Sequence, residues 1–282
     1  MIPVAHITHW RGKAPWPADA QIEQDLILTK AVIQIYSDPL LTEAFAFRGG
    51  TAMQKLFFEE PTRYSEDIDL VQVRAEPIGA AIDALRKHLD PWLGKPSRDT
   101  KKDRVTLIYR FDSEIAPIKR MRLKVEVNTG EHFTVLGTKR LPLTCDSEWF
   151  RGSADILTYE VEELLGTKMR ALYQRKKGRD LYDLAMALKH FSKLDLPKTI
   201  KCFEHYMNHG KTPVSRAQFE ANFANKLKDP GFIADIQPLL APHAPTYDAV
   251  AEAEAVKSAF LARLQGDPWK DPAKKNSDRR KA

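Results

Sequence analysis

Two aspartates separated by one residue are the strongest candidates for chemistry in this sequence. Asp67 and Asp69 begin an alternating stretch that predicts a strand over 67–73. In a strand, period two puts both carboxylates on one face while Ile68 and Leu70 turn to the other. Adjacent carboxylates repel each other unless a cation lies between them, and their oxygens suit a hard divalent ion such as Mg²⁺. Taken alone, so short a motif is typical of a solvated strand end.

A glycine turn upstream adds weight to the aspartate pair. Gly49, Gly50 and Thr51 follow a predicted strand over 45–48 and begin a predicted helix over 51–59, with Lys55 one turn further on. Glycines let backbone N–H groups approach a phosphate closely, and a helix N-terminus favours negative charge. These residues are therefore candidates for binding a nucleotide. The alternative is an ordinary Gly-Gly turn with Thr51 as the helix N-cap.

A third acid lies on a later strand. The sequence predicts strands over 104–111 and 118–128, and in the second one the polar face holds Arg120, Arg122, Lys124 and Glu126. Glu126 can serve as a third metal ligand if its strand joins the same sheet as Asp67. A surface row of ion pairs is the competing interpretation.

Charge and composition restrict the class of protein. The 44 Lys and Arg residues exceed the 38 Asp and Glu residues, and six cations without an acid fall in 168–179, four more in 119–124. Such patches fit a polyanion such as a nucleoside triphosphate or RNA, or else are solvated faces. The two cysteines, Cys145 and Cys202, lie far apart, which argues against a zinc site or a disulfide framework. No secretory signal and no apolar run of ~20 residues are found, so we expect a soluble cytoplasmic protein without a membrane segment.

The periodicity predicts an α+β fold in two lobes. Residues 1–150 are expected to form a mixed-sheet core with an N-terminal helix over 19–36, a further helix over 76–92 and a ragged strand over 134–143. Residues 151–265 are expected to form a helical domain, with helices over 159–177, 180–191, 197–208, 215–228 and 247–264. Residues 266–282 are polar and basic, which predicts a disordered tail.

Four blocks in this order resemble a known family. They are residues 48–55 (RGGTAMQK), 63–70 (RYSEDIDL), 162–168 (EELLGTK) and 175–184 (RKKGRDLYDL). Together they resemble the polymerase-β-like nucleotidyltransferase superfamily and, within it, the AbiEii/AbiGii nucleotidyltransferase toxins, which include the MenT toxins. The resemblance implies a nucleotidyltransferase core whose active site is completed by a helical lobe.

The resemblance also implies roles for single residues. Asp67 and Asp69 would bind the metal, Ser65 would lie beside them at the phosphate site, and Gly49, Gly50 and Thr51 would hold the triphosphate. Lys168 matches the catalytic lysine of the family and Asp183 its distal catalytic acid, with Asp180 as a competitor for that role. By residue pattern alone, Lys168 could instead be a surface cation, and the two aspartates could cap a helix start.

The function implied by the resemblance is transfer of a nucleoside monophosphate from a nucleoside triphosphate, dependent on Mg²⁺ or Mn²⁺. The implied acceptor is the 3′ end of tRNA, and the implied role is that of the toxin in a toxin–antitoxin or abortive-infection system, with a cognate antitoxin as partner. Two alternatives stay open: a protein or small-molecule acceptor, and a non-catalytic module that binds nucleotide or RNA.

Overall fold

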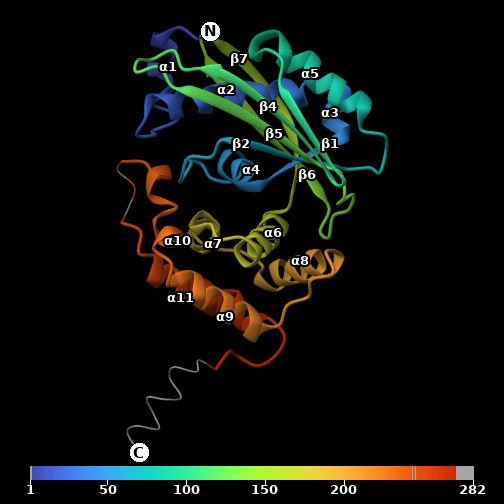
Figure 1. Cartoon of the computed structure of the whole chain (residues 1–282), viewed down its shortest axis with the longest axis vertical. Coiled ribbons are helices and arrows are strands. Elements are labelled where there is room, and N and C mark those ends of the chain that lie inside the picture. Colours follow the sequence, from blue (N-terminus) through green and yellow to red (C-terminus); the bar gives the residue numbers. More distant parts are fainter. Residues whose placement is uncertain (1, 243, 245, 271–282) are drawn as a thin grey trace, which may run out of the picture. The chain divides into compact units, whose positions relative to one another are not determined.

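The computed structural model describes residues 2–242, 244 and 246–270. Its contacts divide the chain into two compact units. The first comprises Met1–Val161 and Leu239–Ala244, and the second comprises Glu162–Pro238 and Pro245–Ala282. Figure 1 shows the elements of both. Of the predicted tail, residues 271–282 lie outside the described residues, whereas the backbone N–H of Trp269 donates to Glu220 at 2.8 Å.

The first unit contains a seven-stranded mixed sheet in the order β3-β4-β5-β2-β1-β7-β6. The neighbours β2–β5 and β1–β7 are parallel, and the other pairs are antiparallel. The strands are β1 Phe45–Arg48, β2 Asp67–Gln72, β3 Ser97–Lys101, β4 Arg104–Asp112, β5 Arg120–Asn128, β6 Thr138–Ser147 and β7 Phe150–Tyr159.

The helices of this unit cover the apolar face of the sheet and connect its strands. They are α1 Val4–Trp10, α2 Asp19–Tyr36, α3 Pro39–Ala44, α4 Gly49–Leu56 and α5 Gly79–Leu93. Leu123 and Val125 alternate along β5 with polar neighbours and are fully buried in the same core as Ile22 and Leu26 of α2. Each such side chain contributes about 1.5–3 kcal/mol by leaving water. The apolar face therefore holds the strands rigidly and leaves the opposite face for polar side chains.

The second unit is helical. It contains α6 Val161–Gln174, which begins at the boundary, then α7 Gly178–His190, α8 Leu196–His209, α9 Arg216–Leu227, α10 Pro230–Ala234 and α11 Ala249–Ala259, with short 3₁₀ turns η1 Gln237–Leu239 and η2 Leu261–Arg263. Helices α6 and α8 pack closely at Gly166, because a Cβ there would lie 2.7 Å from the Cβ of Cys202 and 2.8 Å from the backbone nitrogen of Phe203. Phe203 in turn packs against Phe219 of α9, with ring centroids 5.6 Å apart. This packing fixes the helix that carries Lys168.

The predicted α+β class, a mixed sheet followed by helices, is confirmed. Two strands were not predicted. All five residues of β3 are exposed, so no apolar alternation marks it. Strand β7 reaches Tyr159, and the units therefore meet at Val161, after the last strand rather than near residue 150.

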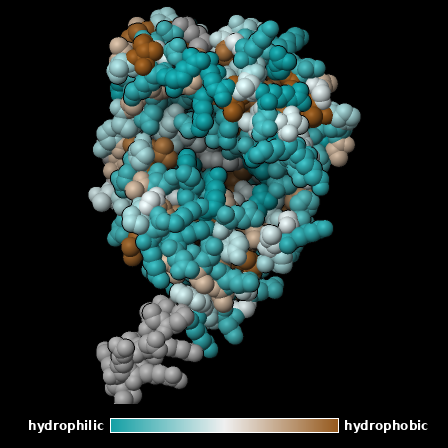
Figure 2. Space-filling model, viewed as in Figure 1, coloured by the Kyte–Doolittle hydropathy of each residue, from teal (hydrophilic) through white to brown (hydrophobic). Residues whose placement is uncertain are grey.

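Surface and helix properties agree with the composition. Hydrophilic residues cover most of the face shown in Figure 2, and the hydrophobic ones there form small separate spots. No helix among the described residues is both long and apolar enough to cross a membrane.

Candidate active site

The two aspartates and the later glutamate lie on one face of the sheet. In the parallel register of β2 and β5, Asp67 is opposite Lys124 and Asp69 is opposite Glu126. Asp67 and Asp69 are half-buried, while Ile68 between them is fully buried in the core. The period of two thus places both carboxylates as predicted, and the parallel pairing brings Glu126 to the same face.

The Gly49 turn lies directly against one of these carboxylates. Gly49 has a φ of +82°, and a Cβ there would lie 3.1 Å from both Cβ and Cγ of Asp69, with a carboxylate oxygen closer still. The antiparallel register supports this proximity, because Arg48 is the Cα partner of Asp69. Only glycine has both the backbone freedom and the space that this position requires.

The hydroxyl groups of Thr51 and Ser65 connect the glycine helix to the start of β2. Thr51 Oγ1 lies 2.8 Å from Ser65 Oγ and donates to the backbone oxygen of Asp67 at 2.5 Å. Thr51 is not the helix cap, since Arg48 takes the N-cap position and α4 has no side-chain cap. The alternative of an ordinary Thr51 cap is therefore wrong, and the hydroxyl instead fixes the strand end that carries Asp67.

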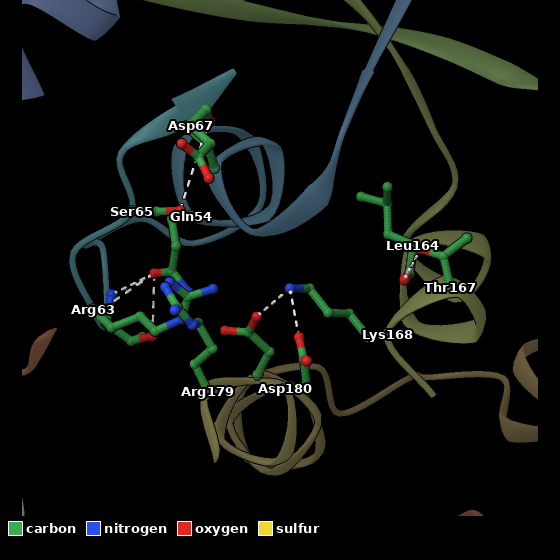
Figure 3. A network of polar contacts seen from close by, with 12 residues as sticks. Gln54, Arg63, Ser65, Asp67, Leu164, Thr167, Lys168, Arg179 and Asp180 are labelled. Carbon is green, nitrogen blue, oxygen red and sulfur yellow. Dashed lines mark hydrogen bonds and ion pairs between the residues drawn. The ribbon is translucent and has the colours of Figure 1, made fainter. Parts of the chain in front are cut away.

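Gln54 and Arg63 order the loop before β2, and sequence reasoning assigned neither a role. The Gln54 side-chain oxygen accepts from the backbone N–H groups of Thr62 at 2.7 Å and Arg63 at 3.3 Å (Figure 3). Arg63 is almost fully buried, and its Cζ would lie 3.4 Å from a Cβ at Gly50. A guanidinium therefore lies against the first turn of α4. Its position inside the RYSEDIDL block was the only signal.

Lys55 was predicted to bind the nucleotide, but in the structure its side chain forms an ion pair away from the glycine turn. Its ammonium pairs with Asp25 of α2 at 2.7 Å, and both side chains are largely shielded from solvent. The same carboxylate accepts from the indole N–H groups of Trp10 at 2.9 Å and Trp16 at 3.2 Å. Lys55 thus anchors α4 to the N-terminal segment.

Lys124 lies among the three acids. Its ammonium is 3.2 Å from Asp67 Oδ2 and 3.5 Å from Glu126 Oε2, and Arg104 is 3.7 Å from the same glutamate oxygen. Burial alone would lower the pKa of Lys124, but the neighbouring carboxylates outweigh it and raise the pKa, so the side chain stays charged. Glu126 is therefore already paired with cations.

The Asp67–Asp69 pair has the electrostatics of a cation site. Burial, followed by the charge of Asp67, raises the pKa of Asp69. A divalent cation would remove this penalty, and four carboxylate oxygens are the donors that Mg²⁺ or Mn²⁺ prefers. Within the described ranges, no three His, Cys, Asp or Glu side chains converge as a ready-made metal site. The two aspartates fit a cation, whereas Glu126 does not converge with them.

A second cluster, in the second unit, surrounds Lys168. This lysine is only 5% exposed, so the alternative of a surface cation is wrong. Its ammonium lies 2.8 Å from Asp183 Oδ2 and 3.3 Å from Asp180 Oδ1 (Figure 3 shows Lys168 and Asp180). Neither aspartate caps α7, which has no side-chain cap. Both are fully buried and directed at the lysine.

Asp180 has a second cationic partner besides Lys168. Arg175 binds Asp180 with two hydrogen bonds of 2.7 Å, from Nε and from Nη2. Burial would raise the pKa of Asp180, but Lys168 and the Arg175 hydrogen bonds outweigh it and lower the pKa. Asp180 is thus held ionised in a fork, while Asp183 makes the shorter contact with Lys168. The assignment of Asp183 rather than Asp180 as the distal catalytic acid stays a prediction.

Most cations of the run 168–179 are neutralised within the second unit. Besides the contacts of Lys168 and Arg175, Lys176 pairs with Asp229, and Lys177 and Arg179 pair with Asp235. Tyr182, in the helix that follows this run, is buried against Tyr247. On the sheet, Arg120 and Arg122 are both exposed, and Arg120 pairs with Asp112 at 3.0 Å. Arg122 of β5 is therefore an exposed cation without an acid partner among the described residues.

The chain was compared with known proteins and solved structures. No curated protein matches the chain. Among solved structures, MenT4, a nucleotidyltransferase toxin from Mycobacterium tuberculosis, matches with a TM-score of 0.63 at 14% identity over 95% of this chain and 92% of that one. An antigenic nucleotidyltransferase-like protein from Paracoccidioides brasiliensis matches at 18% identity with a TM-score of 0.38, over 77% of this chain and 94% of that one.

The first of these matches shows the fold, and a family profile goes further. The profile described as "Nucleotidyl transferase AbiEii toxin, Type IV TA system" matches residues 32–255, which include both the aspartate pair and the Lys168 cluster. The chain belongs to the AbiEii family of nucleotidyltransferase toxins of type IV toxin–antitoxin systems.

Proposed function

We propose that this nucleotidyltransferase moves a nucleoside monophosphate from a nucleoside triphosphate to the 3′ acceptor end of tRNA, with Mg²⁺ or Mn²⁺ bound by Asp67 and Asp69. The observation that carries the proposal is the close approach of the Asp69 carboxylate to the Gly49 turn at the start of α4. A phosphate bound at that helix start would lie beside the metal ligands, which is the arrangement that phosphoryl-type transfer needs.

The reaction forms a bond between the acceptor oxygen and the α-phosphorus and breaks the bond from that phosphorus to the bridging oxygen of the β-phosphate. Pyrophosphate leaves, and the acceptor hydroxyl proton passes to solvent. A bound divalent ion supplies charge neutralisation of the phosphates. In the chain itself, Asp67 and Asp69 orient that charge, and the N–H groups of Gly50 and Thr51 are free of a side-chain cap and can donate to phosphate oxygens.

We also propose that Lys168 and Asp183 act in the same reaction, as the family resemblance implies. The support within the second unit is their buried ion pair of 2.8 Å, which fixes the position of a charged lysine. An ammonium held in this way can stabilise a phosphate as a point charge.

The proposed RNA contact is the exposed polar end of β5. Arg122 is exposed and the structure gives its guanidinium no ion pair within the described residues, although Arg110 lies directly opposite on β4. Like charges directly opposite each other on neighbouring strands destabilise a sheet. A polyanion bound there would relieve the repulsion, so this surface fits a phosphate backbone.

The test incubates the purified chain with each of the four labelled triphosphates, Mg²⁺ and total tRNA, and follows the label on a denaturing gel. We expect label on tRNA with the wild type, at least 100-fold less with Asp67→Asn, and unchanged label with Asp155→Asn. Asp155 is a matched control because it is an exposed strand acid on β7, a strand that carries no proposed metal ligand or RNA contact. Label on protein instead of tRNA would show that the acceptor is a protein and that the proposed tRNA acceptor is wrong. Labelling that does not depend on the metal would overturn the assignment of Asp67 and Asp69 as metal ligands.

Two further parts of the proposal concern the cell. The type IV toxin–antitoxin family implies an antitoxin as partner. We propose that the chain acts in the cytoplasm, where tRNA is found, and that co-expression of its antitoxin relieves growth arrest caused by the wild-type chain. The Asp67→Asn variant should cause no arrest to relieve.

A further inference from the structure

The position of Lys124 among the catalytic acids has a consequence for metal binding. The ammonium lies between Asp67 Oδ2 at 3.2 Å and Glu126 Oε2 at 3.5 Å. A cation bridging an aspartate of β2 to the glutamate of β5 would have to occupy the same space. The three carboxylates consequently do not form an open set of oxygen ligands.

The backbone fixes this arrangement. Lys124 is the Cα partner of Asp67 across the parallel β2–β5 pair, and Glu126 lies two residues further along the same strand face. Both strands are central in the sheet, and Val125 between the two polar residues is fully buried. The ammonium therefore projects from a rigid element, and its side chain is only 26% exposed.

The charges on this face favour one divalent ion over two. Asp67, Asp69 and Glu126 carry three negative charges, and Lys124 cancels one of them. A single divalent ion then brings the sum to zero, whereas two such ions would leave an excess of two positive charges before the triphosphate binds. Arg104, 3.7 Å from Glu126, adds another positive charge and so further disfavours a second divalent ion.

Asp69 is the acid of this cluster that lies against the glycine turn. Asp69 lies against Gly49, and a Cβ there would be 3.1 Å from two of its carbon atoms. The Asp67–Asp69 pair thus keeps oxygen atoms for one cation beside the phosphate cradle, while Lys124 occupies the side toward Glu126.

We propose that Lys124 stands permanently in the place of a second metal ion, so that this enzyme binds a single divalent cation, at Asp67 and Asp69. This inference rests on the proposed function and narrows it, because it removes Glu126 from the metal ligands. Lys124 is a positioning residue for the acids and supplies the positive charge that a second ion would bring.

The test counts bound Mn²⁺ by electron paramagnetic resonance in the presence of a saturating, non-hydrolysable triphosphate analogue. We expect one Mn²⁺ per chain for the wild type and two for Lys124→Met, since the vacated space between Asp67 and Glu126 then accepts an ion. Arg122→Met, which removes one charge from the same strand face without touching an acid, should still bind one. Lys124→Arg should also bind one.

A second measurement needs neither metal loading nor activity. Without metal, Lys124→Met should unfold several degrees below the wild type, because the acids then repel one another, and added Mn²⁺ should abolish this difference. Two Mn²⁺ per wild-type chain, or one in Lys124→Met with no metal-free loss of melting temperature, would overturn the inference while leaving the proposed function intact. A folded wild type that binds no Mn²⁺ with the analogue would instead remove the metal from the proposed function.

Discussion

Replacing Gly49 by alanine tests whether the glycine turn and the Asp69 carboxylate form one site. The backbone φ of +82° opposes any side chain, which costs about 1–2 kcal/mol of stability. In addition, the new Cβ would lie 3.1 Å from Asp69 Cβ and Cγ, where ordinary contacts begin at 3.4 Å. The carbon atoms must retreat by at least 0.3 Å, the difference between 3.4 and 3.1 Å, and the carboxylate oxygen must retreat further.

A displaced metal ligand should cost activity beyond the loss of stability. Misplacement of a reacting group by about 1 Å can lower the rate roughly 100-fold, and we expect kcat/KM for nucleotidyl transfer to fall by about 10- to 100-fold in Gly49→Ala. The matched control is Gly94→Ala, which has a φ of +79° but no atom within 4 Å of its Cβ. It should lose comparable stability in urea unfolding and keep its activity.

The comparison of Gly49→Ala with Gly94→Ala decides whether the contact between the glycine turn and Asp69 takes part in the reaction. If Gly49→Ala loses no more activity than Gly94→Ala once both are assayed as folded protein, the contact between the turn and Asp69 has no part in the reaction. The proposed phosphate cradle would then be wrong.

Three further predictions concern stability. Burial raises the pKa of Glu23 to about 7, so the stability contributed by its protonated form is full below pH 4.5 and is lost as the pH rises through 7. Between pH 5 and pH 8 the unfolding free energy of the wild type, measured in urea, should therefore fall by up to about 3 kcal/mol more than that of Glu23→Gln. Equal pH dependence of the two proteins would contradict this. Lys168→Met should lose about 3–5 kcal/mol of unfolding free energy in urea because it removes the lysine from the buried Asp183 carboxylate, and adding Asp183→Asn should recover part of this loss. No recovery would show that the pair is not coupled. Gly166→Ala should lower the free energy of unfolding by about 1–3 kcal/mol, because its new Cβ would clash with the backbone of α8. Gly79→Ala, with open space around the new Cβ, should not lower it. Calorimetric melting curves of the two variants check this, and equal melting temperatures would contradict it.

Much of the fold followed from local patterns. The aspartate pair could be placed on one face because alternation alone determines side-chain direction in a strand, and α2 was predicted over 19–36 as found. Strand β3 could not be predicted, because it forms through backbone pairing with β4 while all its side chains stay in solvent. Strand β7 buries no residue along its first half, where intermediate and exposed positions alternate, so no alternation of buried apolar residues marks it.

The ion-pair partners of individual lysines could not be predicted from the sequence, for a different reason. Lys55 and Lys124 are both lysines near the proposed site, and nothing local distinguishes them. Lys55 turns to Asp25, which lies 30 positions upstream, and Lys124 turns to the acids because of the strand register. Both outcomes depend on which strands and helices become neighbours, which composition and spacing do not specify. The burial of Lys168 was hidden for the same reason.

The contacts of the Asp25 carboxylate limit how far this protein can be truncated from its N-terminus. Two indoles from the first sixteen positions and the ammonium of Lys55 all converge on it, yet the profile match starts only at residue 32. A shortened polypeptide that began there would lack the acid, both tryptophans and more than half of α2. The helix bearing the glycines would then lose its anchor to the N-terminal segment, so the span of a sequence match should not be taken as the span of a unit that folds.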